Sequence, residues 1–221
     1  MHGSGDSSRQ DQPRIVELLA RLEAFARDRT GGDSPFNRGC SEDEIRHMEK
    51  VIRTPLPDDY KELLRHANGQ PDDSELVFPP DQLAFLSAEE VVELWQGHRE
   101  LPDDEFFDEL TYEDKVRCVP FHPARIPIAQ YEDGGAYLWI DNVPGPAGRS
   151  GQLIFNVDEI DFAVVEESVT ELFRRYVSLL DTGAAALTEV PSDYGEGYWF
   201  TASGRYLDFA VYDELRRPSS P

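Results

Sequence analysis

Apolar side chains recur at helical spacing between residues 41 and 54, which predicts a short amphipathic helix. Ser41 and Glu44 have the spacing of a capping box, in which each side chain binds a backbone N–H of the first turn. We expect this helix to end near Thr54, because a residue that precedes proline, here Pro55, is displaced from the α region.

A second helix is predicted to begin at Pro57, whose missing N–H costs nothing in a first turn. Asp58 and Asp59 then lie near the positive end of the helix dipole. Asn68 and Gly69 are expected to end this helix with a left-handed C-cap. Its buried stripe is expected to consist of Tyr60, Leu63, Leu64 and Ala67. The pattern therefore predicts two helices joined by a sharp corner.

Four strands are predicted between residues 125 and 166. They cover residues 126–130, 137–140, 152–157 and 162–165. Pro127 indicates an edge or bulge position in the first strand, because proline cannot donate to a sheet. The second strand is apolar on both faces and is expected to be central, whereas the third alternates between a buried and a more polar face. Short separations favour antiparallel hairpins.

Three further helices and a short strand complete the pattern. Apolar side chains spaced between Ile15 and Phe25 mark an N-terminal helix that precedes a linker from Thr30 to Gly39, and capping boxes begin helices at Ser87 and at Ser168. The segment 76–78 is predicted to form a short strand that ends at two prolines.

These segments resemble the SUKH superfamily, named partly for a yeast regulator of cell-wall synthesis. Its members carry E-x-x-I-x-x-x-E, L-P-x-D-Y and a terminal N-G, which here are Glu42/Ile45/Glu49, Leu56 to Tyr60 and Asn68-Gly69. A second similar block comprises residues 126–129, Gly134-Gly135 and residues 137–141. The resemblance covers about residues 41–182, and its motif positions include Pro57, Tyr60, Asn68, Gly69, Pro127 and Trp139. The alternative is an ordinary helix pair in an unrelated fold.

The expected fold class is α+β, with a single, mainly antiparallel sheet of about 4–6 strands packed with helices in a SUKH-like arrangement. Residues 1–12 are polar and expected to be disordered, and residues 13–183 are expected to form the domain. Residues 184–221 carry seven aromatic side chains, so we expect this extension to fold back on the domain as a hairpin or strand and a short helix.

Acidic side chains outnumber basic ones by 44 to 21, and the net charge is −23. Such a surface repels phosphates, which argues against binding of nucleic acid. It attracts a basic partner and accelerates encounter with it. Simple solubility, or adaptation to a salty or acidic setting, is the competing explanation.

Residues 102–114 carry seven carboxylates and no basic side chain. The carboxylates are Asp103, Asp104, Glu105, Asp108, Glu109, Glu113 and Asp114. A charge run of this kind is usually a solvated loop or short helix. Four large apolar side chains, Phe106, Phe107, Leu110 and Tyr112, indicate that the segment docks onto the body or faces a partner. Asp141 ends a central strand, so it is expected either to stabilise a turn or to contact a partner.

No motif for catalysis, a cofactor or a metal ion is recognisable, so we expect a protein that is not an enzyme. Cys40 and Cys118 predict free thiols in a reducing compartment. The N-terminal residues have no apolar run typical of a signal peptide, and no stretch is apolar enough to span a membrane. A cytoplasmic protein is therefore expected.

The resemblance implies two functions, because bacterial members are commonly immunity proteins that neutralise a toxin, often a nuclease, and the eukaryotic branch acts as a regulatory scaffold. The acid excess favours an immunity-type protein that binds a basic toxin, a nuclease among the candidates, directly through an acidic surface. The alternative is a regulatory scaffold or peptide-binding module that neutralises nothing. Neither the partner nor the oligomeric state follows from these patterns.

Overall fold

The computed structural model describes residues 13–32, 34–72, 74, 76–99, 110–111, 113–117, 119, 121–131, 134–156, 162–190 and 197–216. Helices and strands alternate irregularly along the chain, as expected for an α+β fold. The helices are α1 (Ile15–Thr30), α2 (Glu42–Ile52), α3 (Asp58–His66), α4 (Ala88–Arg99), α5 (Val169–Asp181) and α6 (Phe209–Arg216). The strands are β1 (Leu83–Phe85), β2 (Leu110–Thr111), β3 (Val116–Arg117), β4 (Arg125–Tyr131), β5 (Tyr137–Asp141), β6 (Gln152–Asn156), β7 (Phe162–Glu166), β8 (Ala186–Glu189), β9 (Tyr198–Ala202) and β10 (Arg205–Tyr206).

Five strands form the main sheet in the order β1-β4-β5-β6-β7, and every neighbouring pair is antiparallel. The expected α+β class with a mainly antiparallel sheet is therefore confirmed. The register of β4 against β5 shifts between Pro127 and Ala129, so Pro127 lies at the expected bulge. β5 lies at the centre of the sheet, again as predicted.

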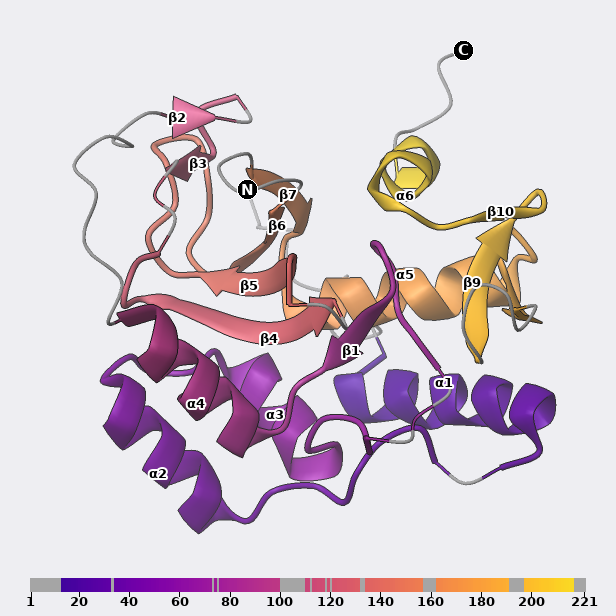
Figure 1. Cartoon of the computed structure of the whole chain (residues 1–221), viewed down its shortest axis with the longest axis horizontal. Helices are drawn as coiled ribbons and strands as arrows, with labels where there is room; N and C mark the ends of the chain where they lie inside the picture. Colours follow the sequence, from indigo (N-terminus) through magenta and orange to yellow (C-terminus); the bar gives the residue numbers. More distant parts are fainter. Residues whose placement is uncertain are drawn as a thin grey trace, which may run out of the picture.

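Apolar side chains cover both faces of this sheet. Ile126, Leu138 and Leu153 belong to the main core, which the helices complete. α2, α3 and α4 lie on one side of the sheet, and the β2–β3 hairpin lies on the other (Figure 1). There a second cluster is formed by Val116, Trp139, Ile154, Phe162 and Val164. The predicted contrast between a buried and a more polar face of β6 does not extend to burial, because all five of its residues, Gln152 and Asn156 included, are buried.

The C-terminal segment forms a three-stranded sheet in the order β10-β9-β8, followed by α6. Phe200 of β9 packs against Phe78 and Tyr176, with ring centroids 5.9 and 5.5 Å apart. Phe209 of α6 stacks on Phe155 of the main sheet at 6.0 Å. These contacts place the C-terminal aromatic side chains in the same core as the helices and the main sheet.

The predicted helical corner is present. The Ser41 and Glu44 side chains form a complete capping box at the start of α2. Arg53 then ends the helix in a left-handed conformation, with φ of 53°. Asp59 joins the corner to the rest of the fold, because its carboxylate accepts a hydrogen bond of 3.0 Å from the Thr170 N–H at the start of α5. Tyr60, Leu63 and Leu64 are buried as predicted.

Asn68 and Gly69 do not cap α3, contrary to the sequence-based prediction. The helix ends at His66, and its C-cap residue Ala67 is extended. The Asn68 side chain instead accepts a hydrogen bond of 2.7 Å from the Ala88 N–H at the start of α4. Gly69 has φ of +69° and lies so close to the backbone before α4 that a Cβ atom would be 2.3 Å from the Ser87 nitrogen. The pair therefore joins α3 to α4.

We expect Gly69→Ala to lower the free energy of unfolding by about 2–5 kcal/mol, because it combines a left-handed backbone with a backbone clash. Gly31→Ala is the matched control, since Gly31 also has positive φ but nothing within 4 Å of an added Cβ. The control should lose only about 1–2 kcal/mol, the cost of the backbone conformation. Urea unfolding of both variants measures the difference. Equal losses would contradict the close approach of Gly69 to Ser87.

Two smaller predictions need correction. Residues 76–78 do not form a strand, since Leu76 and Phe78 make only isolated bridges to Tyr198 and Leu83. At α5 the Ser168 side chain accepts a hydrogen bond from the Glu171 N–H, but the reciprocal half of the capping box is missing. The capping box at Ser87 and Glu90 is complete.

Across the described helices, none combines the length and the apolar character needed to cross a membrane.

Candidate partner-binding site

The acid-rich segment, residues 102–114, includes β2 and part of the turn of the β2–β3 hairpin. Its last two carboxylates, Glu113 and Asp114, belong to the described residues and are exposed. The other five, Asp103, Asp104, Glu105, Asp108 and Glu109, lie outside the described residues, as do the side chains of Phe106, Phe107, Leu110 and Tyr112. The expectation that those four apolar groups dock onto the body or face a partner therefore stays a prediction.

Glu113 and Asp114 form the turn between β2 and β3. Both have positive φ, of 57° and 60°. The Glu113 side chain is 82% exposed, and its carboxylate lies 3.0 Å from the Lys115 ammonium group. Leu110 pairs with Arg117, and Thr111 pairs with Val116. The hairpin thus presents these two carboxylates to solvent at its tip.

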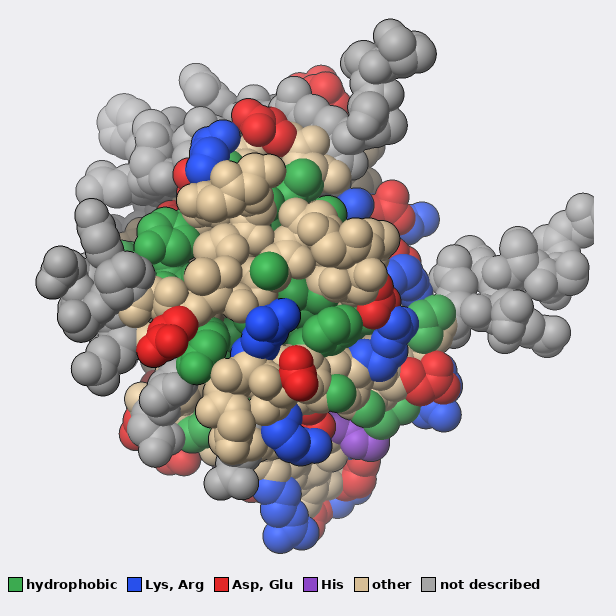
Figure 2. Space-filling model, turned by 90° about the vertical axis from the view of Figure 1, so that its right-hand side faces the viewer, with side chains coloured by type: hydrophobic (Ala, Val, Ile, Leu, Met, Phe, Trp, Pro, Cys, Tyr) green, Lys and Arg blue, Asp and Glu red, His purple; other side chains and the backbone are tan. Residues whose placement is uncertain are grey.

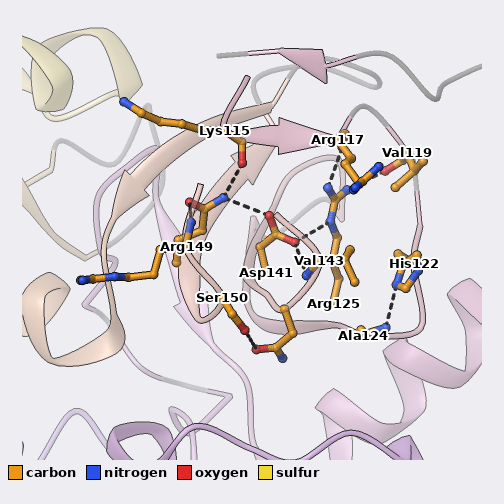
Figure 3. A network of polar contacts seen from close by, with 12 residues as sticks. Lys115, Arg117, Val119, His122, Ala124, Arg125, Asp141, Val143, Arg149 and Ser150 are labelled. Carbon is orange, nitrogen blue, oxygen red and sulfur yellow. Dashed lines mark hydrogen bonds and ion pairs between the residues drawn. The ribbon is translucent and has the colours of Figure 1, made fainter. Parts of the chain in front are cut away.

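Arg125 fixes the chain that follows this hairpin (Figure 3). Its guanidinium group donates hydrogen bonds of 2.6 Å to the backbone oxygen atoms of Arg117 and Val119. The same group lies 4.9 Å from the centre of the Phe162 ring. Arg125 is 1% exposed, so it holds the segment from within the protein and not from its surface.

Asp141 balances the buried charge of Arg125. The two residues are direct partners across β4 and β5, and Arg125 Nε lies 3.4 Å from Asp141 Oδ1. Asp141 Oδ1 also accepts a hydrogen bond of 3.1 Å from the Val143 N–H. Asp141 is 0% exposed. Its carboxylate therefore has a structural role at the turn after β5, and the expected contact with a partner is not supported.

Gln152 extends this buried network from the next strand, where it pairs directly with Asp141. Its Nε2 donates to Asp141 Oδ2 at 3.0 Å and to the Lys115 backbone oxygen at 2.9 Å. Its Oε1 accepts from the Arg149 N–H at 3.0 Å. The two polar atoms of this one buried amide therefore make three hydrogen bonds, which join the turn before β3, the end of β5 and the β5–β6 loop.

The β5–β6 loop packs closely on the other side of the hairpin. The Gly145 N–H donates to the Lys115 oxygen at 2.9 Å, and the Ala147 N–H donates to the Asp114 oxygen at 3.1 Å. A Cβ atom on Gly145 would lie 2.2 Å from the Asp114 oxygen, so only glycine permits this approach. The backbone oxygens of Asp114 and Lys115 are therefore held by this loop, and those of Arg117 and Val119 are held by Arg125.

Trp139 lies beneath the hairpin, in the second apolar cluster. It is 2% exposed and meets the His98 ring edge-on, with ring centroids 5.2 Å apart. Tyr137 packs against both rings. These aromatic contacts bury Trp139 on the side of the sheet that carries the β2–β3 hairpin, and they support a structural role for this residue.

Acidic side chains do not dominate every face of the protein. Figure 2 views the end of the protein at which β9 and β10 lie, and basic side chains are mixed there with acidic and hydrophobic ones. This end therefore carries no continuous acidic surface, and the exposed tip of the β2–β3 hairpin is the part of the acid-rich segment that the structure describes.

Two features bear on other kinds of site. Burial raises the pKa of the Cys40 thiol to about 11, with a smaller contribution from the charge of Glu44, so this thiol stays protonated and unreactive at neutral pH. Within the described ranges, no group of three or more His, Cys, Asp or Glu side chains could hold a metal ion. Cys118 lies outside those ranges.

Sequence reasoning did not identify Arg125 or Gln152. A long polar side chain at the start of a predicted strand is usually exposed, and neither residue belongs to a recognisable motif. One signal was present, because Asp141 ends a strand that is apolar on both faces and so needs a buried partner. The cross-strand register that supplies Arg125 appears only in the folded sheet.

A model of the SMI1 / KNR4 family (SUKH-1) matches residues 39–175, which is more than half of the chain. The matched range begins just before α2 and ends within α5. It contains the helical corner, the main sheet and the whole network around Arg125, whereas α1 and the C-terminal sheet lie outside it. A search among curated proteins finds no match.

Proposed function

This chain belongs to the SMI1 / KNR4 family (SUKH-1), and from that membership and its acidic character we propose that it is an immunity-type protein. It acts by binding and not by catalysis. It neutralises a cognate basic toxin, with nucleases as one candidate class, by direct contact through an acidic surface. The proposed compartment is the cytoplasm.

The observation that carries this proposal is the acid-rich segment and its attachment. Five carboxylates precede the β2–β3 hairpin and two lie at its tip, and the hairpin backbone is held by Arg125 and by the β5–β6 loop. A fixed backbone keeps exposed charges in place before a partner arrives, so less conformational entropy is lost on binding. A net charge of −23 also attracts a basic protein before the two surfaces touch.

A pull-down with the full-length chain tests the proposal, and mass spectrometry identifies what is captured. We expect one basic protein to dominate. Expression of that protein should be toxic to cells, and co-expression of this chain should protect them. Several partners of modest affinity and no protection would instead favour a regulatory scaffold or peptide-binding module. A toxin gene directly upstream would also support the immunity function.

Replacing the seven carboxylates by their amides should slow association with the captured protein by about 10- to 100-fold at low salt and flatten its salt dependence. The variant changes Asp103, Asp104, Glu105, Asp108, Glu109, Glu113 and Asp114 to Asn or Gln. Stopped-flow mixing at several salt concentrations measures both effects. The expected loss lies in the association rate, because exposed charges act mainly before contact.

The matched control neutralises seven exposed carboxylates on other elements. They are Asp28, Asp43, Asp72, Glu89, Glu93, Glu189 and Glu214. Both variants gain the same net charge, so a difference between them reports where the charges lie. We expect the control substitutions to lower the logarithm of the association rate constant by less than a third of the decrease in the acid-rich segment variant. If the two variants associate equally slowly, total charge is responsible and the acid-rich segment is not the binding surface.

A further inference from the structure

A cavity of about 250 Å³ lies between the turn after Phe78 and the C-terminal sheet. Asp81 and Gln82 line it from the turn, and Trp199 and Tyr206 line it from β9 and β10. Asp208 lines it just before α6. These C-terminal residues all lie outside the range matched by the family model, so the cavity is not a feature of the matched region alone.

Two aromatic rings form part of the cavity wall. Trp199 and Tyr206 have ring centroids 4.4 Å apart and planes inclined by 60°. Tyr206 is 38% exposed, which is unusual for a large apolar side chain in the described part of this protein. An aromatic face that borders a cavity attracts cations, because the π electrons carry negative charge.

Two carboxylates add negative charge to the same cavity. The Asp81 N–H donates to the Leu207 oxygen at 3.3 Å, which brings Asp81 beside Asp208. Burial raises the pKa of the Asp81 carboxyl, and the charge of Asp208 raises it further. Asp208 also accepts a hydrogen bond of 2.8 Å from the Val211 N–H. Among the described residues, neither carboxylate forms an ion pair.

We propose that this cavity binds an arginine or lysine side chain of a basic protein partner. The occupant follows from complementarity: the carboxylates pair with the positive charge, and the Trp199 and Tyr206 rings contact the aliphatic stem or the cation itself. A neutral side chain of the same shape would leave two adjacent carboxylates without a counter-charge. The cavity is therefore selective for charge as well as for shape.

The cavity shares with the proposed function the expectation of a basic partner, but its test requires no toxin. Failure of the peptide test below would remove the cavity as a binding site and leave the neutralisation experiment unaffected. Conversely, an absence of protection in cells would not affect binding of a basic side chain here.

The experiment titrates the ¹⁵N-labelled full-length chain with acetylated, amidated Gly-Arg-Gly, Gly-Lys-Gly and Gly-citrulline-Gly peptides. The chain has three tryptophans, so the indole N–H signals serve as separate reporters. We expect the basic peptides to shift the Trp199 signal with a dissociation constant on the order of 1 mM. Trp95 and Trp139 are each 2% exposed and lie away from the cavity, so their signals should stay in place.

Two variants test the two kinds of contact. Asp81→Asn removes a charge and keeps a residue type that tolerates the φ of 69° found at this position. Tyr206→Ala removes an exposed ring with little effect on the core. Each should weaken binding of the arginine peptide about tenfold or more. Glu189→Gln is the matched control, because it removes one exposed carboxylate from β8 in the same small sheet, and it should bind normally.

Binding of the citrulline peptide as tightly as the arginine peptide would overturn the proposal. Unchanged binding by Asp81→Asn would do so as well, as would the absence of any Trp199 shift at peptide concentrations well above the expected dissociation constant. The dispersion of the amide spectrum shows whether each variant is folded. If Asp81→Asn is not folded, Tyr206→Ala and the comparison of arginine with citrulline decide the matter.

Discussion

Arg125→Ala is expected to lower the free energy of unfolding by about 3–5 kcal/mol, because it leaves the Asp141 carboxylate buried without its counter-charge. The side chains of the pair are 1% and 0% exposed, so water cannot take over the lost interactions. The substitution also removes the donors that bind the Arg117 and Val119 oxygens at 2.6 Å. Both losses fall on groups inside the protein, where an unsatisfied polar atom is costly.

Urea unfolding followed by circular dichroism measures this loss. Arg149→Ala is the matched control, since the Arg149 guanidinium lies 2.7 Å from Glu167 and both side chains are about 70% exposed (69% and 71%). A solvent-exposed pair of this kind contributes about 0–1 kcal/mol. Arg125→Lys, which keeps the charge but not the planar fork, should fall between the two. If Arg125→Ala were no more harmful than Arg149→Ala, the buried network would not stabilise the fold.

Removal of the Phe200 ring should have an effect of similar size. Phe200→Ala is expected to cost about 3–5 kcal/mol, the usual range for deleting a buried phenyl ring. The side chain is 2% exposed and lies between Phe78 and Tyr176. Phe200→Leu should cost about 1.5 kcal/mol or less, because it keeps most of the buried volume.

The Phe200 variants also test whether the C-terminal sheet folds together with the region matched by the family model. We expect tryptophan fluorescence and far-ultraviolet circular dichroism to report one transition at the same urea concentration, in the parent chain and in Phe200→Leu. A separate, earlier transition in fluorescence would show that β8, β9 and β10 unfold independently of the main sheet. It would contradict a single core that includes Phe78 and Phe200.

Local signals in the sequence predicted most of the helices and strands. The capping boxes at Ser41 and Ser87 and the helix boundary before Pro55 depend on neighbouring residues only, and all three are confirmed. The bulge at Pro127 follows from the missing N–H of proline in the same way. The resemblance to the SUKH superfamily rested on these segments, and the family match confirms it.

The errors concern residues whose role depends on distant parts of the chain. Asn68 and Gly69 have the composition of a helix C-cap, yet they pack against the start of α4, which nothing near them in the sequence indicates. Gln152 and Asn156 suggested a more polar face of β6 beside a buried one, but the β2–β3 hairpin and the β5–β6 loop supply the hydrogen bonds that allow Gln152 to be buried. Asp141 was assigned two alternative roles because its partner lies on another strand.

The sequence by itself determined where the helices begin, the antiparallel strand pattern, the family and the acid excess, because each depends on residue type and short-range spacing. The tertiary structure alone decided which polar residues are buried together, since the pairing of Arg125, Asp141 and Gln152 requires the register of three adjacent strands. It also decided that Asp81 and Trp199 line one cavity, because only folding brings the turn after Phe78 against the C-terminal sheet. Both sites arise from contacts between segments far apart in the chain, and short-range patterns carry no information on such contacts.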